Sequence, residues 1–207
     1  MEIRANKNDE IEIRTHHEEL EVMEERADGD KRIIEGYAAV FGKWTQIGSE
    51  KYGWKERIQK GAFSKALIER EVLQLRDHDW GKILGRAGIN LELKEDDKGL
   101  KFRLEVPNTV LGDETLELVR KKIIKGCSFG AYTKKDTWTF DKENQVNYRT
   151  IEELDLREVT LTAIPAYTQT TATARSRADE LRAQEEVDLA WEKRKQEILN
   201  KYKKEGK

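Results

Sequence analysis

Three kinds of side chain in this sequence have the chemistry to hydrolyse an acyl bond together. His78, the only histidine outside the N-terminal stretch, lies where an apolar segment runs into a turn, and Ser128 lies between two glycines in residues 126–130. Glu158 and Asp155 lie in a later apolar segment. An imidazole, which titrates near pH 6.5 when unperturbed, can take the proton of a serine hydroxyl, and a carboxylate can hold the imidazole in one tautomer. The set predicts a base, a nucleophile and an orienting acid.

The order of these residues excludes one familiar hydrolase class. Residues 126–130 match the G-x-S-x-G nucleophile elbow of α/β-hydrolases, in which the histidine follows the serine. No histidine follows Ser128 in this chain, so the match is accidental or purely local. Each residue also has a structural interpretation: Ser128 as a strand-end residue, His78 as a turn residue, and the carboxylates as salt-bridge partners of Arg86 or Arg157.

Strand periodicity bears on the choice between the two carboxylates. Alternation at period two places Glu158 on one face with Leu154 and Leu156, and Asp155 on the other. Either carboxylate would need a donor on its face, because burying a lone charge is costly. Cys127 is an alternative nucleophile, but a small buried residue is the simpler interpretation. The histidines and the cysteine lack metal-ligand spacing, so we expect no metal and no cofactor.

Composition further narrows the class of protein and the partners that it can have. The chain of 207 residues is 39% charged, above the roughly 25% of an average globular protein, yet its net charge is only −2. A balanced charge argues against a dedicated nucleic-acid binder. A single cysteine fits a reducing compartment, and no apolar run is long enough for a membrane span. We therefore expect a soluble intracellular protein with no membrane and no specific nucleic-acid partner.

The chain divides into three zones. We expect residues 1–30 to be an acidic, flexible arm, residues 31–174 a folded domain, and residues 175–207 a charged helical tail. Val187, Trp191, Ile198 and Tyr202 form a narrow apolar stripe in the tail, which indicates a solvated helix or one that pairs with a partner or a second copy.

The middle zone predicts a β-rich α+β domain or a small β-barrel. The expected strands cover residues 32–41, 72–75, 89–93, 100–106, 128–133, 137–140 and 147–164, and the expected helices cover residues 61–70 and 115–124. The strands at 89–93 and 100–106 should form a hairpin. The expected strands do not alternate with helices, so the pattern gives no indication of a parallel sheet.

Taken together, these segments resemble the prohead maturation proteases of tailed bacteriophages, assemblin-like serine peptidases related to the herpesvirus capsid protease. The resemblance covers residues 33–174 and is carried by segments that occur in the same order, at 35–42, 61–63, 75–79, 84–86, 99–100, 124–130, 156–162 and 165–166.

The resemblance implies an assemblin-like closed β-barrel surrounded by helices. It implies a serine endopeptidase that acts inside the immature capsid, in the host cytoplasm, on the major capsid protein, the scaffold segment and itself, and that works as a homo-oligomer. His78 then corresponds to the general base and Ser128 to the nucleophile. The herpesvirus relatives use a second histidine as third member. Since none follows Ser128, Glu158 takes that place, with Asp155 as the alternative.

Two other interpretations stay open at this point. The chain could be a non-catalytic capsid-assembly or scaffolding module that keeps the protease barrel, in which case substitution of Ser128 would be harmless. It could also be an esterase that uses the same residues on a small substrate.

Overall fold

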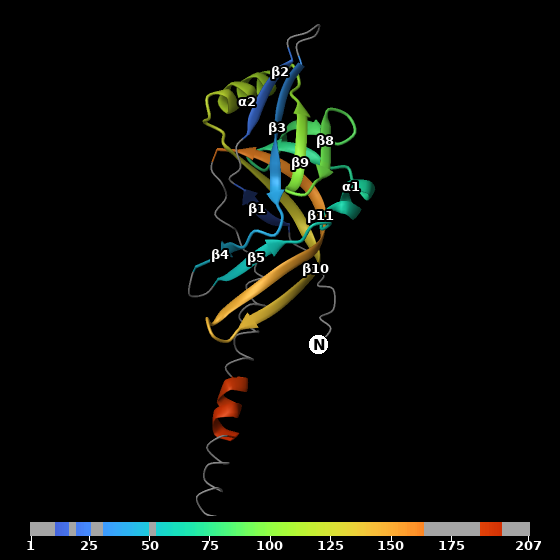
Figure 1. Cartoon of the computed structure of the whole chain (residues 1–207). Helices are drawn as coiled ribbons and strands as arrows, with labels where there is room; N and C mark the ends of the chain where they lie inside the picture. Colours follow the sequence, from blue (N-terminus) through green and yellow to red (C-terminus); the bar gives the residue numbers. More distant parts are fainter. Residues whose placement is uncertain (1–10, 17–19, 26–30, 50–52, 164–186, 196–207) are drawn as a thin grey trace, which may run out of the picture. The chain divides into compact units, whose positions relative to one another are not determined.

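The computed structural model describes residues 11–16, 20–25, 31–49, 53–163 and 187–195. Up to residue 163 they form eleven strands and two helices, so strands dominate the fold (Figure 1). The strands are β1 (Glu12–His16), β2 (Glu21–Glu25), β3 (Lys31–Val40), β4 (Thr45–Ile47), β5 (Trp54–Ile58), β6 (Leu73–Arg76), β7 (Asp79–Arg86), β8 (Leu91–Glu95), β9 (Gly99–Glu105), β10 (Gly126–Asp141) and β11 (Val146–Thr162); the helices are α1 (Ser64–Glu69) and α2 (Val110–Arg120).

The larger sheet is built on the long antiparallel hairpin of β10 and β11. Its main path runs β1-β10-β11-β5-β4, and β6 and β7 join it through β11. One edge of β11 is shared by two parallel neighbours: β5 pairs with residues 148–151, and β6 pairs with residues 158–161. Because β6 leads directly to His78, this pairing brings an early segment of the chain to the end of β11.

The smaller sheet runs β2-β3-β9-β8, with every pair antiparallel. Its apolar side chains and those of the larger sheet form one core, with members such as Ile34, Phe102, Phe129 and Val159. The ring of Phe63, just before α1, meets that of Phe129 edge to face at 5.3 Å between centroids. Burial of this shared core holds the two sheets against each other.

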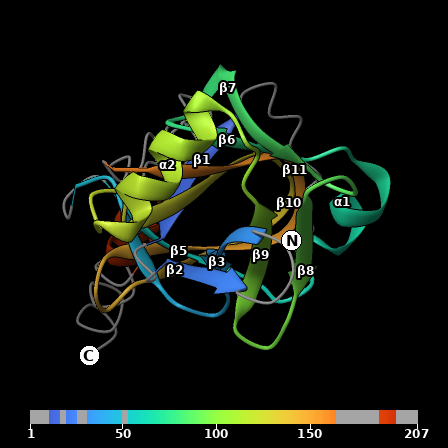
Figure 2. The same cartoon turned by 90° about the horizontal axis from the view of Figure 1, so that it is seen from above.

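The two helices lie on different sides of the strands (Figure 2). Helix α2 starts at residue 110 because Thr109 caps it: the Thr109 side chain accepts a hydrogen bond from the N–H of Gly112. It buries Leu116 and Val119 in the core. Within the described residues, no helix is long and apolar enough to cross a membrane.

The observed strands confirm most of the predicted ones and correct three points. The segments expected as strands 128–133 and 137–140 belong to one continuous strand, β10, in which register shifts near Lys135 absorb the polar residues expected to form a turn. Residues 12–16 and 21–25 form strands β1 and β2, where a flexible arm was expected. Neither sheet closes on itself within the described residues, so the fold is a strand-rich α+β structure with two open sheets rather than the expected closed barrel.

The chain forms two compact units, Met1–Thr171 and Ala172–Lys207. In the second unit the structure describes residues 187–195, which form a helix with exposed side chains, including Val187 and Trp191. Ile198 and Tyr202, the other members of the expected apolar stripe, lie outside the described residues. The boundaries at residues 30 and 174 stay predictions.

Candidate active site

His78 lies at the tip of a tight hairpin between β6 and β7. Arg76 pairs with Asp79, which leaves Asp77 and His78 as a two-residue loop, and both have left-handed backbones with φ of 56° and 55°. A loop of this type matches the twist of the flanking strands, and Asp and His adopt positive φ more readily than most residues. The N–H of Asp77 donates to the carbonyl of Leu161 at 3.1 Å. The hairpin tip is thereby tied to β11.

At this tip His78 meets the buried carboxylate of Glu158. The distance from Nδ1 of His78 to Oε1 of Glu158 is 2.7 Å, with side-chain exposures of 18% and 3%. The other carboxylate oxygen accepts a hydrogen bond from the hydroxyl of Thr160. With both oxygens engaged, Glu158 can hold the imidazole with Nε2 turned away from it, as the orienting acid of a hydrolase does.

Ser128 lies on the neighbouring strand and on the same face of the sheet. In the β10–β11 ladder Ser128 pairs with Thr160, and Gly130 pairs with Glu158. Residues directly opposite each other point to one face, with Cβ atoms roughly 4.5–5.5 Å apart. The ladder therefore gathers the serine, the threonine and the glutamate on the face that His78 reaches.

A β-bulge at Arg157 puts Glu158 on that face. Gly130 pairs with Glu158 whereas Ala131 pairs with Leu156, so Arg157 is the extra residue on β11. An extra residue reverses the alternation of faces beyond it. The prediction that Glu158 shares a face with Leu154 and Leu156 was therefore wrong.

Asp155 has a different environment from Glu158. Its buried carboxylate accepts hydrogen bonds from Arg70 and from Arg157, each at 2.9 Å, and Lys134 lies 3.6 Å away. This is the salt-bridge interpretation that the sequence left open, and Arg157 is one of the partners it named. Arg86 instead pairs with Glu71. Of the two candidate acids, Glu158 is the one that contacts His78.

Gly130 is a site residue that the sequence analysis did not single out. A Cβ at this position would lie 2.4 Å from Oε1 of Glu158, closer than nonbonded atoms can approach. The carboxylate thus occupies the space that any other residue at position 130 would fill. The signal was present in the sequence, because Gly130 is the second glycine of the motif around Ser128.

Ser128 itself is fully buried, with 0% exposure. Its Oγ donates a hydrogen bond to the backbone carbonyl of Arg14 on β1, at 2.8 Å. Within the described residues, Nε2 of His78 is also buried and has no hydrogen-bond partner. The nitrogen that would accept a proton is therefore shielded from solvent, and the hydroxyl that would give it up is bonded to the N-terminal strand.

Cys127 does not compete with Ser128 as a nucleophile. Burial, and secondarily the nearby Glu158 carboxylate, raise the pKa of the Cys127 thiol. A thiol held protonated is a poor nucleophile. Its neighbours in the core confirm the expectation of a small buried residue.

A histidine held by a glutamate, with a serine facing the same side of the sheet on the strand next to that glutamate, is the type of arrangement that serine hydrolases use. The sequence model of the caudovirus prohead serine proteases matches residues 18–203. The chain belongs to this family of phage proteases.

A solved structure supports the fold. The bacteriophage T4 capsid assembly protease, gp21, superposes with a TM-score of 0.51 over 76% of this chain and 100% of that one, at 15% sequence identity. At such low identity the likeness concerns the fold alone. No curated protein matches the chain in sequence.

Proposed function

We propose that this chain is a serine endopeptidase that cleaves scaffold and capsid proteins, and itself, during maturation of the phage prohead. The observation that carries the proposal is the 2.7 Å contact between Nδ1 of His78 and Oε1 of Glu158, on the sheet face that also holds Ser128. Membership of the prohead protease family and the fold shared with a capsid assembly protease support the substrate class.

The reaction would run through an acyl-enzyme. Nε2 of His78 takes the proton of Ser128 as Oγ attacks the scissile carbonyl, and the same nitrogen then protonates the leaving amine. Water attacks the resulting ester while His78 again accepts a proton, which returns to Oγ when the serine is released. Glu158 stabilises the imidazolium in both steps, and Thr160 holds Glu158 in place. No cofactor takes part.

The setting follows from the substrate class. The protease would act inside the immature capsid in the host cytoplasm, with the major capsid protein and its scaffold segment as partners, and would work as a homo-oligomer. A distant relation to the herpesvirus capsid protease stays a prediction.

Coexpression with the major capsid protein of the same phage tests the proposal. The wild type should shorten both the capsid protein and itself, whereas Ser128→Ala should leave both proteins at full length. Intact-mass measurement distinguishes the two results. Ser64→Ala, which removes a serine hydroxyl on α1, is the matched control and should behave like the wild type. Equal cleavage by Ser128→Ala and the wild type would exclude Ser128 as nucleophile.

One observation favours the alternative of a non-catalytic assembly module that keeps the protease fold. The complete burial of Ser128, with its hydroxyl bonded to Arg14, is what a purely structural serine would show. The same coexpression separates the two functions, because a module of this kind would support assembly of intact shells equally well with Ser128→Ala.

A further inference from the structure

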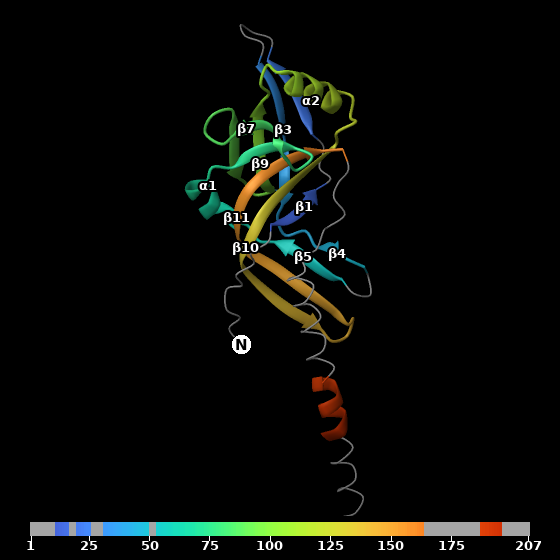
Figure 3. The same ribbon diagram turned by 180° about the vertical axis from the view of Figure 1, so that it is seen from behind.

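Strand β1 lies along the edge of the strand that carries the candidate nucleophile. It pairs antiparallel with β10, with Ile13 opposite Gly130 and Thr15 opposite Ser128, and it is an end strand of the larger sheet (Figure 3). The carbonyl oxygen of Arg14 sits 2.8 Å from Oγ of Ser128. A peptide substrate must bring its own carbonyl to this oxygen, so β1 and a substrate cannot both be there.

Ile11, the residue just before β1, also covers the site. A Cβ at position 130 would lie 3.1 Å from Cγ2 of Ile11 and 3.2 Å from Cδ of Glu158. Ile11 is therefore packed over the gap that Gly130 leaves for the carboxylate. Ser128 is inaccessible while this segment is docked.

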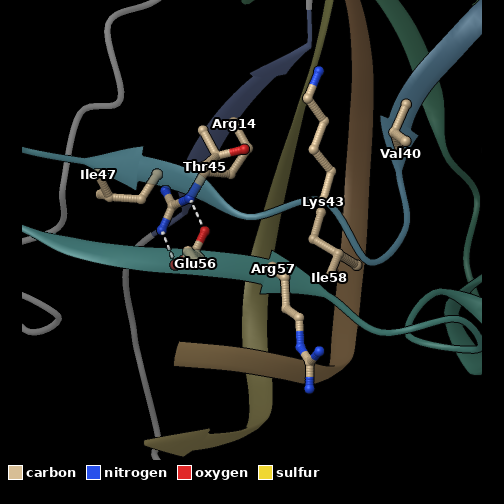
Figure 4. Close-up of a pocket in the computed structure, with 8 residues that line it drawn as sticks. All are labelled: Arg14, Val40, Lys43, Thr45, Ile47, Glu56, Arg57 and Ile58. Carbon is tan, nitrogen blue, oxygen red and sulfur yellow. Dashed lines mark hydrogen bonds and ion pairs between the residues drawn. The ribbon is translucent and has the colours of Figure 1, made fainter. Parts of the chain in front are cut away.

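On its inner face, β1 is held by a buried cluster of four charged residues, which we call the charge cluster: Glu12 and Arg14 from β1, Glu56 from β5, and Arg149 from β11. Nε of Arg14 lies 2.6 Å from Glu56, and Arg149 lies 2.7 Å from Glu12. All four side chains are at most 4% exposed. Figure 4 shows Arg14 and Glu56 reaching toward each other beside a small pocket.

The charge cluster would stay partly paired without β1. Departure of β1 would remove one acid and one base, Glu12 and Arg14. Glu56 and Arg149 remain paired at 2.9 Å, and Arg149 keeps a second acid, Asp136, at 2.7 Å. No buried charge loses all its partners, and an unpaired buried charge is the costly outcome.

We propose that β1 is an inhibitory strand: it occupies the edge of β10 on which an extended peptide substrate pairs, and it must leave before Ser128 can react. The inference rests on the proposed function and adds the docking surface of the substrate and the regulation of the site. An extended substrate that replaces β1 would gain the same main-chain hydrogen bonds, as in other proteins that bind peptides by strand addition.

A releasing variant and a lock test the proposal on the full chain. Glu12→Ala together with Arg14→Ala removes the two β1 members of the charge cluster, and should raise the rate at which a small fluorophosphonate labels Ser128 by about tenfold or more. Lys60→Ala with Asp97→Ala, which removes an exposed ion pair elsewhere, is the matched control and should label at the wild-type rate. Thermal unfolding of each variant verifies that it is folded.

The lock uses a cysteine already in the chain. His16 pairs with Cys127 across β1 and β10, and the Cα spacing of opposed residues in an antiparallel ladder, about 4.5–5.5 Å, suits a disulfide. His16→Cys in the releasing variant should be labelled fast when reduced and at the slow wild-type rate when oxidised, with reductant restoring the fast rate. In the same protein carrying Cys127→Ser, oxidant should not change the rate at which Ser128 is labelled.

The outcomes separate this inference from the proposed function. Ser128-dependent labelling at one rate in the wild type, the releasing variant and both redox states of the lock overturns the inhibitory role but leaves the protease function standing. Absence of Ser128-dependent labelling and of capsid-protein cleavage in every folded form overturns both. If the releasing variant does not fold, His16→Cys alone carries the test, with oxidation expected to stop cleavage of coexpressed capsid protein and equal cleavage in both redox states overturning the inhibition.

Discussion

Gly130 and Glu158 face each other across the β10–β11 ladder, and the carboxylate of Glu158 fills the volume that a side chain at position 130 would need. Gly130→Ala should therefore displace Glu158 from His78. We expect a large loss of protease activity and a fall of about 1–3 kcal/mol in the free energy of unfolding, as overpacking of a core usually gives. Peptide hydrolysis and urea unfolding measure the two effects. Gly81→Ala is the control, because a Cβ there meets only the flexible side chain of Asp79, and it should change neither the activity nor the free energy of unfolding. Full activity in Gly130→Ala would contradict the inferred clash with Glu158.

The two candidate acids should separate cleanly in mutants. Glu158→Gln keeps the size of the side chain but removes the charge that stabilises the imidazolium, so kcat should fall on the order of 10³-fold or more. Asp155→Asn should leave kcat nearly unchanged and lower the free energy of unfolding by about 1–3 kcal/mol through its weakened bonds to Arg70 and Arg157. Steady-state kinetics and denaturant unfolding of the pair decide the assignment. A large loss of kcat in Asp155→Asn, with little loss in Glu158→Gln, would make Asp155 the carboxylate that acts with His78 and Ser128.

Thr160 should act as a positioning residue through its hydroxyl. Thr160→Val removes the hydrogen bond to Glu158 while keeping the shape of the side chain, so kcat should fall by about tenfold, the equivalent of one ordinary hydrogen bond. Thr160→Ser keeps the donor and should retain most of the activity. KM should be similar in both, since the hydroxyl is bonded to Glu158 and Thr160 lies on β11, on the side of β10 away from the proposed substrate-binding edge. A loss of equal size in Thr160→Ser would show that packing, and not the hydrogen bond, is responsible.

The charge cluster should make stability depend on pH in acid. Burial by itself would raise the pKa of Glu12, but Arg14 and Arg149 outweigh it and lower the pKa from 4.5 to about 2. Ionised Glu12 therefore stabilises the fold at neutral pH, and this contribution, about 3 kcal/mol, is lost as the pH falls from about 4.5 through about 2. Urea unfolding at several pH values between 6 and 2 measures the loss. Glu12→Gln should be less stable at pH 6 and show a flatter dependence. An equal slope in both proteins would contradict the role of Glu12.

Much of the candidate site could be predicted from local sequence. His78 and Ser128 stand in short motifs at the ends of apolar segments, so each could be picked out from its own motif. The choice between Glu158 and Asp155 could not be made in this way. The bulge at Arg157 reverses the alternation of faces and leaves both carboxylates on one face, since Glu158 lies opposite Gly130 and Asp155 lies opposite Tyr132. The choice depends on the pairing of β6 with residues 158–161, which brings His78 to Glu158, and a pairing between such distant segments leaves no mark in the local pattern of apolar residues.

Strand β1 escaped prediction for a different reason. Its inward-facing residues are Glu12 and Arg14, so its pattern of apolar and polar residues is inverted relative to an ordinary strand. The partners that make this burial tolerable, Glu56 and Arg149, are separated from β1 by 42 to 137 positions in the sequence. A strand whose buried face is charged can be recognised only once its distant partners are known.

The shared edge of β11 has a consequence for the timing of folding. Strands β5 and β6 leave the ribosome early, yet their parallel partner is the last of the described strands, and Glu158 follows His78 by 80 positions. Contacts between such distant segments form late and slowly. The nascent chain therefore cannot bring His78, Ser128 and Glu158 together before almost all of the described strands have been synthesised, so a protease that uses these three residues would stay inactive on the polysome.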